Sequence, residues 1–246
     1  LANKTDVGRR RENNEDYFSL NEKLALLVVA EGMGGHASGE TASRLAVQAL
    51  QDYFQGNRHQ IAKADASCSE TTQRLGASIQ HANRVVYDAA KTSPTLNGMG
   101  TTIAAVALKG NRLSIAHIGD SRVYLIRSGS ISQLTDDHSF VQEQVRQEQL
   151  SADEAAQSGL KNILTRALGI DAETTADTSE LTVLDSDILL LCSDGLYNMV
   201  PDGKMMAIIS RATDAAAACK TLIDAANAGG GKDNISVIVG YVRKEK

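Results

Sequence analysis

Five carboxylates lie where an apolar or β-branched stretch of the sequence meets a turn, most of them beside glycines: Asp16, Glu31, Asp120, Asp194 and Asp233. A carboxylate directly after a buried strand is costly unless it is hydrogen-bonded or bound to a cation. Hard divalent cations such as Mg²⁺ and Mn²⁺ bind oxygen ligands, mostly carboxylates and water. Any one of these residues could instead cap the backbone of its own turn. Taken together, the five indicate a divalent-cation site.

The strands that could bring these carboxylates together are predicted from short runs of apolar and β-branched residues separated by turn residues. The runs are 17–20, 24–30, 101–108, 112–118, 123–127, 131–134, 181–184, 188–192 and 235–242. The polar residues 21–23 join the first two runs and predict a hairpin. The turns within 109–130 predict a meander of short strands.

Helices are predicted where apolar residues recur at helical spacing, over 42–53, 75–86 and 215–226, and the last is stopped by the glycines at 229–231. A shorter pair is predicted at 140–147 and 152–157, where Ser151 and Glu154 have the spacing of a capping box. The strands cluster in hairpins, and the helices fall between the clusters. This order favours antiparallel sheets covered by helices over a doubly wound parallel fold.

The composition is that of a globular protein: of 246 residues, 42% are hydrophobic and 22% are charged, with a net charge of -5. The acidic balance argues against nucleic-acid binding, which requires a basic surface. There are two prolines, and we find no low-complexity linker and no internal repeat. We therefore predict a single domain spanning residues 1–246.

The three cysteines, Cys68, Cys192 and Cys219, are far apart and form no CxxC pair, so we expect neither a disulfide framework nor a zinc site. The longest apolar run, 24–30, is too short to span a bilayer. Residues 1–11 contain no hydrophobic signal-peptide core. We expect a cytoplasmic protein without a membrane segment in this chain.

Eight segments resemble, in order, the motifs of the metal-dependent Ser/Thr protein phosphatases, the PPM or type-2C family, and especially its bacterial single-domain members. They are TDVGRRRENNED at 5–16, VAEGMGGH at 29–36, GMGTT at 98–102, HIGDSR at 117–122, LTDDHS at 134–139, LTRALG at 164–169, CSDGL at 192–196 and GKDNIS at 231–236. One short match would be weak evidence, whereas eight in order, covering nearly the whole chain, are specific.

The resemblance implies an α+β fold, a four-layer α-β-β-α sandwich in which two antiparallel β-sheets are flanked by helices, with a two-metal site at one end. It implies that Asp194 and Asp233 bind metal directly. Glu31 occupies the position of the bridging ligand, and the carbonyl of Gly32 would bind one metal. Asp120 matches a ligand of a weaker third metal.

Other matched residues would act around the metals. Glu15 and Asp16 would hold metal-bound waters with Asn234 beside them, and Arg11 would grip the substrate phosphate through its planar set of donors. The resemblance implies hydrolysis of phosphoserine and phosphothreonine by a hydroxide that bridges two or three Mn²⁺ or Mg²⁺ ions. The expected partners are phosphoproteins, including a bacterial Ser/Thr kinase and its substrates, and the expected state is a monomer.

One residue of the implied metal site departs from the family pattern, because Glu31 stands where the family has Asp. The extra methylene moves the carboxylate by roughly 1.5 Å unless the chain compensates. A misplacement of about 1 Å can cost about a hundredfold in rate. We therefore expect weakened metal binding or lowered turnover. The alternative is that Glu31 adopts another rotamer and still bridges the metals.

The general acid and the substrate-selecting segment are less well defined by the sequence. Some relatives place His directly after the Asp-Gly pair, where this chain has Met33. His36 is a nearby candidate for the general acid, and water is the competing donor. Residues 139–163 correspond to a flap, and within it 157–162 differ from the His-Pro pair of many relatives. Polar segments near active sites often select substrates, so we expect this role of the flap.

Two other classes of function compete with an active phosphatase. A pseudophosphatase, or a phosphoprotein-binding regulator with little turnover, is motivated by Glu31 alone, while the intact Arg11, Asp194 and Asp233 argue against it. A structural module would use the carboxylates as turn caps. That module would show no metal-dependent change in stability.

Overall fold

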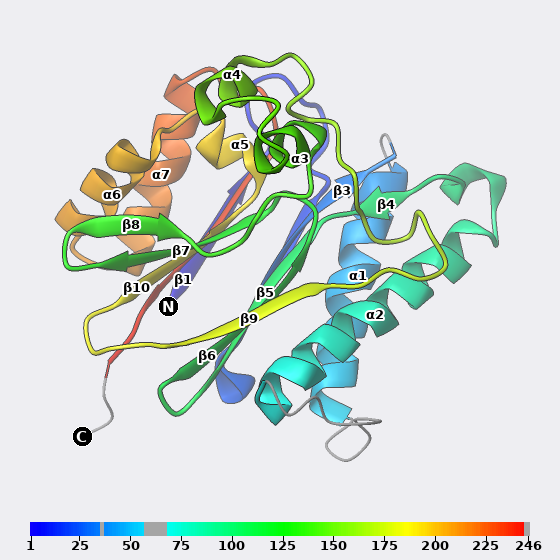
Figure 1. Ribbon diagram of the computed structural model, residues 1–246, viewed down its shortest axis with the longest axis horizontal. Coiled ribbons are helices and arrows are strands. Elements are labelled where there is room, and N and C mark those ends of the chain that lie inside the picture. The colour runs from blue at the N-terminus through cyan, green and yellow to red at the C-terminus, as the bar shows by residue number, and fades with distance from the viewer. Residues whose placement is uncertain (35–36, 57–67, 244–246) are drawn as a thin grey trace.

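The computed structural model describes residues 1–34, 37–56 and 68–243 and has four layers (Figure 1). One sheet has the strand order β1-β11-β10-β7-β8. Its antiparallel strands are β1 (Ala2–Asp6), β11 (Ile235–Tyr241), β10 (Ile188–Cys192), β7 (Arg122–Arg127) and β8 (Ser130–Gln133).

The second sheet is also antiparallel and has the order β2-β3-β5-β6-β9, with the short β4 paired to the end of β3. Its strands are β2 (Asp16–Asn21), β3 (Leu26–Met33), β4 (Gly100–Thr101), β5 (Ile103–Lys109), β6 (Arg112–Ile118) and β9 (Asp177–Thr182). The predicted hairpin between β2 and β3 is confirmed, and its turn contains a short 3-10 helix at Glu22–Leu24.

Helices form the two outer layers, as Figure 1 shows. One side carries α1 (Ala37–Gly56) and α2 (Glu70–Ala90), and the other carries α6 (Asp202–Arg211) and α7 (Ala215–Ala228). The shorter helices are α3 (Phe140–Arg146), α4 (Ala152–Gln157), α5 (Asp194–Tyr197) and a 3-10 turn at Pro94–Leu96. The predicted four-layer α+β sandwich is therefore confirmed. Among the described residues, we find no helix with the length and apolar content of a membrane span.

The alternation of side chains along the strands accounts for the layers. In β3, Val28 and Ala30 belong to the core beneath α1 and α2, while Leu27 and Val29 lie in the core between the sheets. Strand β10 alternates in the same way between the inter-sheet core and the core beneath α6 and α7. A strand buried on both faces reads as a continuous apolar run, which is why the sequence predicted β3 and β10 well.

The elements that the sequence analysis missed or misplaced are mostly polar. Strand β1 was not predicted, and β9 was predicted at 181–184 but lies at Asp177–Thr182. Both are edge strands with one neighbour each, β11 and β6. Backbone pairing rather than an apolar pattern defines such strands, since one face meets solvent. Helix α6 was also missed, although Met205 and Ile209 are buried at helical spacing.

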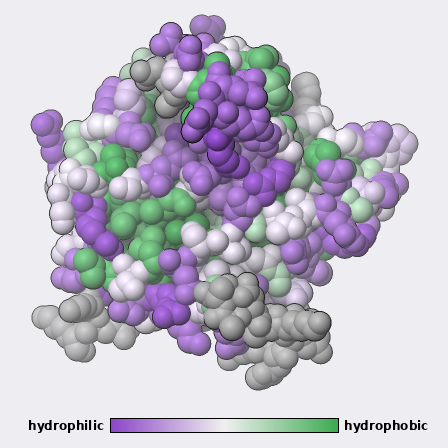
Figure 2. Space-filling model, viewed as in Figure 1, coloured by the Kyte–Doolittle hydropathy of each residue, from purple (hydrophilic) through white to green (hydrophobic). Residues whose placement is uncertain are grey.

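The surface in Figure 2 is uneven. Hydrophilic residues predominate around the position of α3, although hydrophobic residues also reach the surface at the upper edge of the view. Hydrophobic residues gather on the open side of the sandwich, between the positions of β8 and β9 in Figure 1. Partly buried hydrophobic residues border the inter-sheet core, among them Leu134 and Leu181.

Backbone hydrogen bonds close the base of the segment predicted as a flap, 139–163, and His138 attaches it to the sandwich. The N–H of Phe140 donates to the carbonyl of Ile163 (2.8 Å), and the N–H of Thr165 donates to the carbonyl of His138 (2.9 Å). His138 also exchanges hydrogen bonds with Gly119, through its own N–H (3.0 Å) and through Nδ1, which accepts from the N–H of Gly119 (3.1 Å). Within α4, Ser151 and Glu154 form the predicted capping box.

His138 is buried and its imidazole is held in the neutral form. Its side chain is 1% exposed, and its ring stacks on that of His117 with centroids 4.6 Å apart. Burial, the neighbouring His117 and the charge of Arg166 lower the pKa of His138 to about 4. The unfolded chain, with a His pKa of about 6.5, therefore binds this proton first as pH falls. The contribution of His138 to stability is complete above about pH 6.5 and is lost toward pH 4.

We predict that His138→Asn weakens this acid sensitivity, because Asn can still accept from the N–H of Gly119 but does not titrate. Between pH 7 and pH 5 in EDTA, the wild type should lose about 2 kcal/mol more unfolding free energy than the variant. Urea unfolding at the two pH values measures the difference. His81→Asn, at an exposed site, should behave like the wild type. Equal losses in wild type and His138→Asn would contradict the prediction.

Candidate metal centre

A buried amide side chain, that of Asn234, makes three of the hydrogen bonds that hold the loop carrying Arg11. The side-chain oxygen of Asn234 accepts from the N–H of Glu15 (2.8 Å), and its nitrogen donates to the carbonyls of Val7 (3.0 Å) and Asn13 (2.9 Å). Asn234 is 4% exposed. It therefore joins both ends of the loop to the start of β11.

The five candidate carboxylates come from strand ends that the topology brings to one end of the sandwich. Asp16 and Glu31 are opposite one another in the β2–β3 register. Asp194 begins α5 directly after β10, and Asp233 precedes β11, the antiparallel neighbour of β10. Asp120 lies in the turn between β6 and β7. The sheet pairing thus explains why residues far apart in the sequence share one site.

Three of these carboxylates form a compact group. Glu31, Asp194 and Asp233 each offer one oxygen, and the three oxygens lie within 4.8 Å of one another. The N–H of Asp194 also approaches Oε2 of Glu31 at 3.5 Å. Oδ1 of Asp194 and Oδ1 of Asp16 are buried and have no hydrogen-bond partner. Buried carboxylate oxygens without donors are the groups that a cation would satisfy.

The carboxylates disfavour one another's ionised form. Burial, followed by repulsion from Asp194 and the other acids, raises the pKa of Glu31 well above its usual value. Burial and the charge of Asp120 do the same for Asp194. Burial is also the main cause that raises the pKa values of Asp16 and Asp120 to about 6. Divalent cations would reverse this balance by supplying opposite charge. The residues present fit a divalent-metal site.

Arg11 lies beside the carboxylates and reaches solvent. Its Nη2 donates to Oδ2 of Asp233 at 2.7 Å, and its side chain is 51% exposed. The hydrogen bond that Arg11 donates to Asp233 raises the pKa of Arg11. Gly8 (φ +84°) lets the loop approach closely, because a Cβ at this position would lie 2.2 Å from the carbonyl oxygen of Asp233.

A cavity of about 440 Å³ opens over the group. Arg11, Glu31, Asp120, Asp194 and Asp233 all line it. An exposed guanidinium facing buried and half-buried carboxylates in one cavity could bind a phosphate whose charge is shared with metal ions.

Three further residues were predicted to belong to the site: Gly32, Glu15 and His36. Gly32 lies in β3 and its N–H donates to the carbonyl of Glu15 (3.0 Å). A Cβ at Gly32 would lie 2.1 Å from the carbonyl oxygen of Gly39, so this position has no room for a side chain. Glu15 itself is buried. His36, the candidate general acid, lies outside the described residues.

Three side chains that position the carboxylates were not identified from the sequence. Nδ2 of Asn198 donates to Oδ2 of Asp194 (2.9 Å), and the hydroxyl of Tyr197 donates to Oδ2 of Asp120 (3.2 Å). Oγ of Ser193 donates to Oδ2 of Asp16 (2.7 Å). The first two lie at the end of α5, the helical turn that Asp194 begins, and Ser193 directly precedes Asp194. The signal available in the sequence was that all three residues lie within four positions of Asp194.

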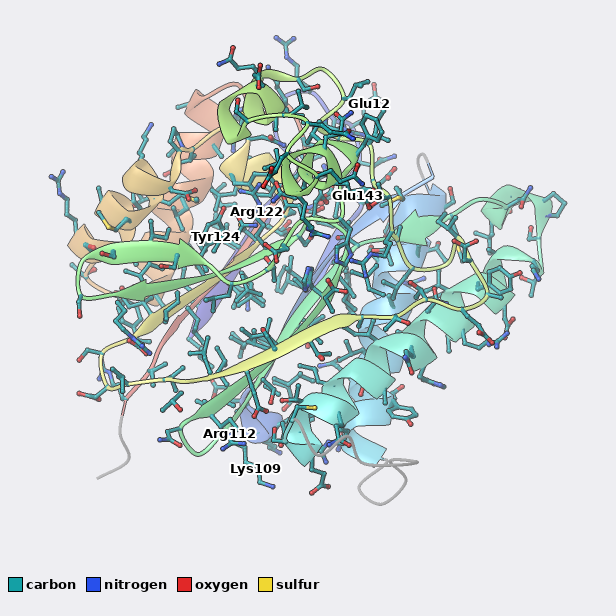
Figure 3. All side chains as sticks on the ribbon, in the orientation of Figure 1. Glu12, Lys109, Arg112, Arg122, Tyr124 and Glu143 are labelled. Carbon is teal, nitrogen blue, oxygen red and sulfur yellow. The ribbon has the colours of Figure 1, made fainter. Side chains whose placement is uncertain are left out.

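Arg122 supports this arrangement from β7. It binds Asp137 through Nε and Nη2, with distances of 2.6–3.1 Å, and its guanidinium lies over the ring of Tyr197, 3.6 Å from the centroid. Its Nη1 donates to the hydroxyl of Tyr124 (2.8 Å), two residues along the same strand (Figure 3). Tyr197 is thereby held between Arg122 and Asp120.

A second cluster of side chains with metal-ligating atoms consists of His117, His138 and Asp177. The side chains of this cluster already bind other residues, or are oriented so that their ligand atoms do not point toward one ion. Nε2 of His117 bonds the carbonyl of Asp136 (2.8 Å), and Asp177 accepts two hydrogen bonds from Arg166 (2.6 and 3.1 Å). The two imidazoles are stacked, with only 30° between their planes. Lone pairs in nearly parallel planes do not converge, so we assign no metal to this cluster.

We predict that Asn234→Ala lowers the unfolding free energy by about 3 kcal/mol, because one buried N–H and two carbonyls each lose a partner worth about 1 kcal/mol. Urea unfolding measures the loss. Asn97→Ala, at an exposed position whose side chain has no assigned role, should change the value by less than about 0.5 kcal/mol. A loss below about 1 kcal/mol in Asn234→Ala would mean that the loop does not depend on this amide.

Comparison with known proteins identifies relatives over nearly the whole chain. The family profile described as Protein phosphatase 2C matches residues 7–227. The serine/threonine phosphatase stp of Listeria innocua is 39% identical over 239 residues, which cover 96% of this chain and 93% of that protein.

Solved structures agree in fold. The serine/threonine phosphatase PstP/Ppp of Mycobacterium tuberculosis superposes with a TM-score of 0.88 at 34% identity, covering 99% of this chain and 98% of that chain. The catalytic domain of PstP in complex with two manganese ions gives a TM-score of 0.84 at 34% identity, covering 99% and 97%. The chain belongs to the protein phosphatase 2C family of metal-dependent Ser/Thr phosphatases.

Proposed function

We propose that this chain hydrolyses phosphoserine and phosphothreonine in proteins with the help of two or three Mn²⁺ or Mg²⁺ ions. The observation that carries the proposal is the group of Glu31, Asp194 and Asp233, whose oxygens lie within 4.8 Å of one another in a cavity that Arg11 also lines. Manganese is present in the solved PstP catalytic domain, which supports the choice of metal.

The metal-holding roles follow from position. Asp194 and Asp233 would bind the ions directly, with Glu31 between them, and the carbonyl of Gly32 would complete one site. Asp120, which lines the same cavity, would take part in holding a third ion. The hydrogen bonds from Asn198 and Tyr197 fix one oxygen each of Asp194 and Asp120 and leave the other oxygen for metal.

Glu15 and Asp16 would hold metal-bound waters. Asp16 suits this role because Oδ2 accepts from Ser193 while Oδ1 is buried without a partner. Asn234 would act indirectly, by fixing the backbone of Glu15. When bound, the cations would lower the pKa of a water between them, so that hydroxide is available near neutral pH.

Arg11 would bind the phosphoryl oxygens of the substrate. Only its Nη2 is bound to Asp233, and a guanidinium has five donors in one plane. The other donors can therefore make charge-assisted hydrogen bonds to phosphate, which place it against the ions and stabilise charge on its oxygens. The Asp233 contact keeps Arg11 at the site before substrate arrives.

The biological partners are inferred from the relatives. Proteins named serine/threonine phosphatases cover nearly all of this chain. We propose phosphoprotein substrates that include a bacterial Ser/Thr kinase and its targets, and a protein that acts as a monomer in the cytoplasm. We also propose a single domain over 1–246 with its flap at about 139–163. A pseudophosphatase is not supported, because Arg11, Asp194 and Asp233 all lie in the site.

We predict that hydrolysis of p-nitrophenyl phosphate and of a phosphothreonine peptide requires Mn²⁺ and stops in EDTA. Asp233→Asn should lower kcat/KM by about a hundredfold or more, because it removes a ligand charge and misplaces the metal. Asp52→Asn, an exposed change on α1 with the same loss of charge, should keep wild-type rates. Activity that persists in EDTA would contradict the metal-dependent mechanism.

We predict that Glu31→Asp raises kcat/KM by about tenfold or more, because the shorter side chain brings the carboxylate to the bridging distance. Mn²⁺ affinity, measured by calorimetry on the same pair of proteins, should rise as well. An equal or lower rate in Glu31→Asp would show that Glu31 already bridges the ions, and the proposed impairment would then be wrong.

A further inference from the structure

The cavity over the carboxylates has an apolar wall whose role the reaction itself does not explain. Met33, Leu164 and Ile170 line it together with Arg11 and the acids. Phosphate, metal ions and water need no apolar contacts. Exposed hydrophobic groups at the rim of a polar site indicate a surface that another molecule covers.

Exposed hydrophobic residues are concentrated in this part of the chain. Three of the seven large exposed hydrophobic residues among those described lie in the flap, and a fourth lies seven residues after it: Phe140, Leu160, Ile163 and Ile170. The hydrogen bond between the N–H of Phe140 and the carbonyl of Ile163 places two of them next to one another at the base of the flap.

Ile170 is 49% exposed and follows a segment of backbone that hydrogen bonds fix to β4 and α2. Its Cδ1 would lie 2.9 Å from a Cβ at Gly100, so its side chain rests on the backbone of β4. Leu168 exchanges two backbone hydrogen bonds with Thr101 (2.8 and 3.0 Å), and the N–H of Gly169 donates to Asn83 (2.8 Å). A fixed apolar surface loses little entropy when a ligand covers it.

The charges near Ile170 disfavour an acidic occupant. Arg166 lines the cavity, but both terminal nitrogens of its guanidinium are bound to Asp177. Asp171 also lines the cavity, and we find no ion pair to its carboxylate within the described part of the chain. An acidic side chain beside Ile170 would therefore meet a like charge, and an aliphatic side chain would bury apolar surface.

We propose that this apolar wall binds a large aliphatic side chain next to the phosphorylated residue of the substrate. The proposal rests on the phosphatase function proposed above and names its substrate class: phosphoserine or phosphothreonine flanked by Leu, Ile or Val. With the phosphate on Arg11, a neighbouring residue of an extended peptide lies within about 3–7 Å along the chain. Ile170 is the residue that determines this specificity.

The test compares three phosphothreonine peptides that differ only in the two residues flanking phosphothreonine, which are Leu, Gln or Glu. For the wild type with Mn²⁺, kcat/KM should be about tenfold higher for the Leu peptide than for the Gln peptide, and lowest for the Glu peptide. In Ile170→Ser, the Leu-to-Gln ratio should fall toward one. Each peptide rate is divided by the same protein's rate on p-nitrophenyl phosphate, which has no flanking residues.

Leu184→Ser is the matched control, because Leu184 is 52% exposed and lines a different cavity. Its Leu-to-Gln ratio should equal that of the wild type. A wild-type ratio near one, or the same ratio in wild type and Ile170→Ser, would overturn the apolar subsite while leaving phosphatase activity intact. Failure of the wild type to hydrolyse any of the peptides and p-nitrophenyl phosphate would instead overturn the proposed function.

Discussion

Mutual repulsion among buried carboxylates is the constraint on which the site depends. Burial and neighbouring acids raise the pKa values of Glu31 and Asp194 well above their usual values, and those of Asp16 and Asp120 rise to about 6. Without cations, the ionised forms of these groups oppose folding near neutral pH. The only cation hydrogen-bonded to the Glu31, Asp194 and Asp233 group, among the described residues, is the half-exposed Arg11. Divalent metal ions would relieve the repulsion between the carboxylates. The positive charge of the same ions would also assist the hydrolysis.

The fold tolerates this cost because the sandwich is stable elsewhere. Three apolar layers extend from the helices through both sheets, and the carboxylates are confined to the strand ends. A small set of hydrogen bonds then fixes the orientation of the acids. Ser193, Tyr197 and Asn198 each donate to one carboxylate oxygen, and Asn234 holds the loop that carries Arg11. Such supporting contacts decide whether metal ligands are presented with the required precision.

Elements buried on both faces could be predicted from the sequence, because β3 and β10 are continuous apolar runs. The edge strand β1 was missed and β9 was misplaced, since the pairing of both depends on backbone groups supplied by distant strands. The carboxylates of the site were predicted from their position at strand ends and from the family resemblance. Their supporting partners were not, because the bond between Ser193 and Asp16 joins residues 177 positions apart. The apolar wall also escaped prediction, since Met33, Leu164 and Ile170 come from separate segments.

The central claim is that buried carboxylate charge destabilises the metal-free protein and is relieved by divalent cations. The most direct measurement is the unfolding free energy of wild type and Asp194→Asn in EDTA and in excess Mn²⁺ at pH 7. We expect Mn²⁺ at about a hundred times its Kd to stabilise the wild type by about 3 kcal/mol. In EDTA, Asp194→Asn should be more stable than the wild type, and it should gain little from Mn²⁺. A wild type unaffected by Mn²⁺, or an Asp194→Asn variant less stable than wild type in EDTA, would contradict the account.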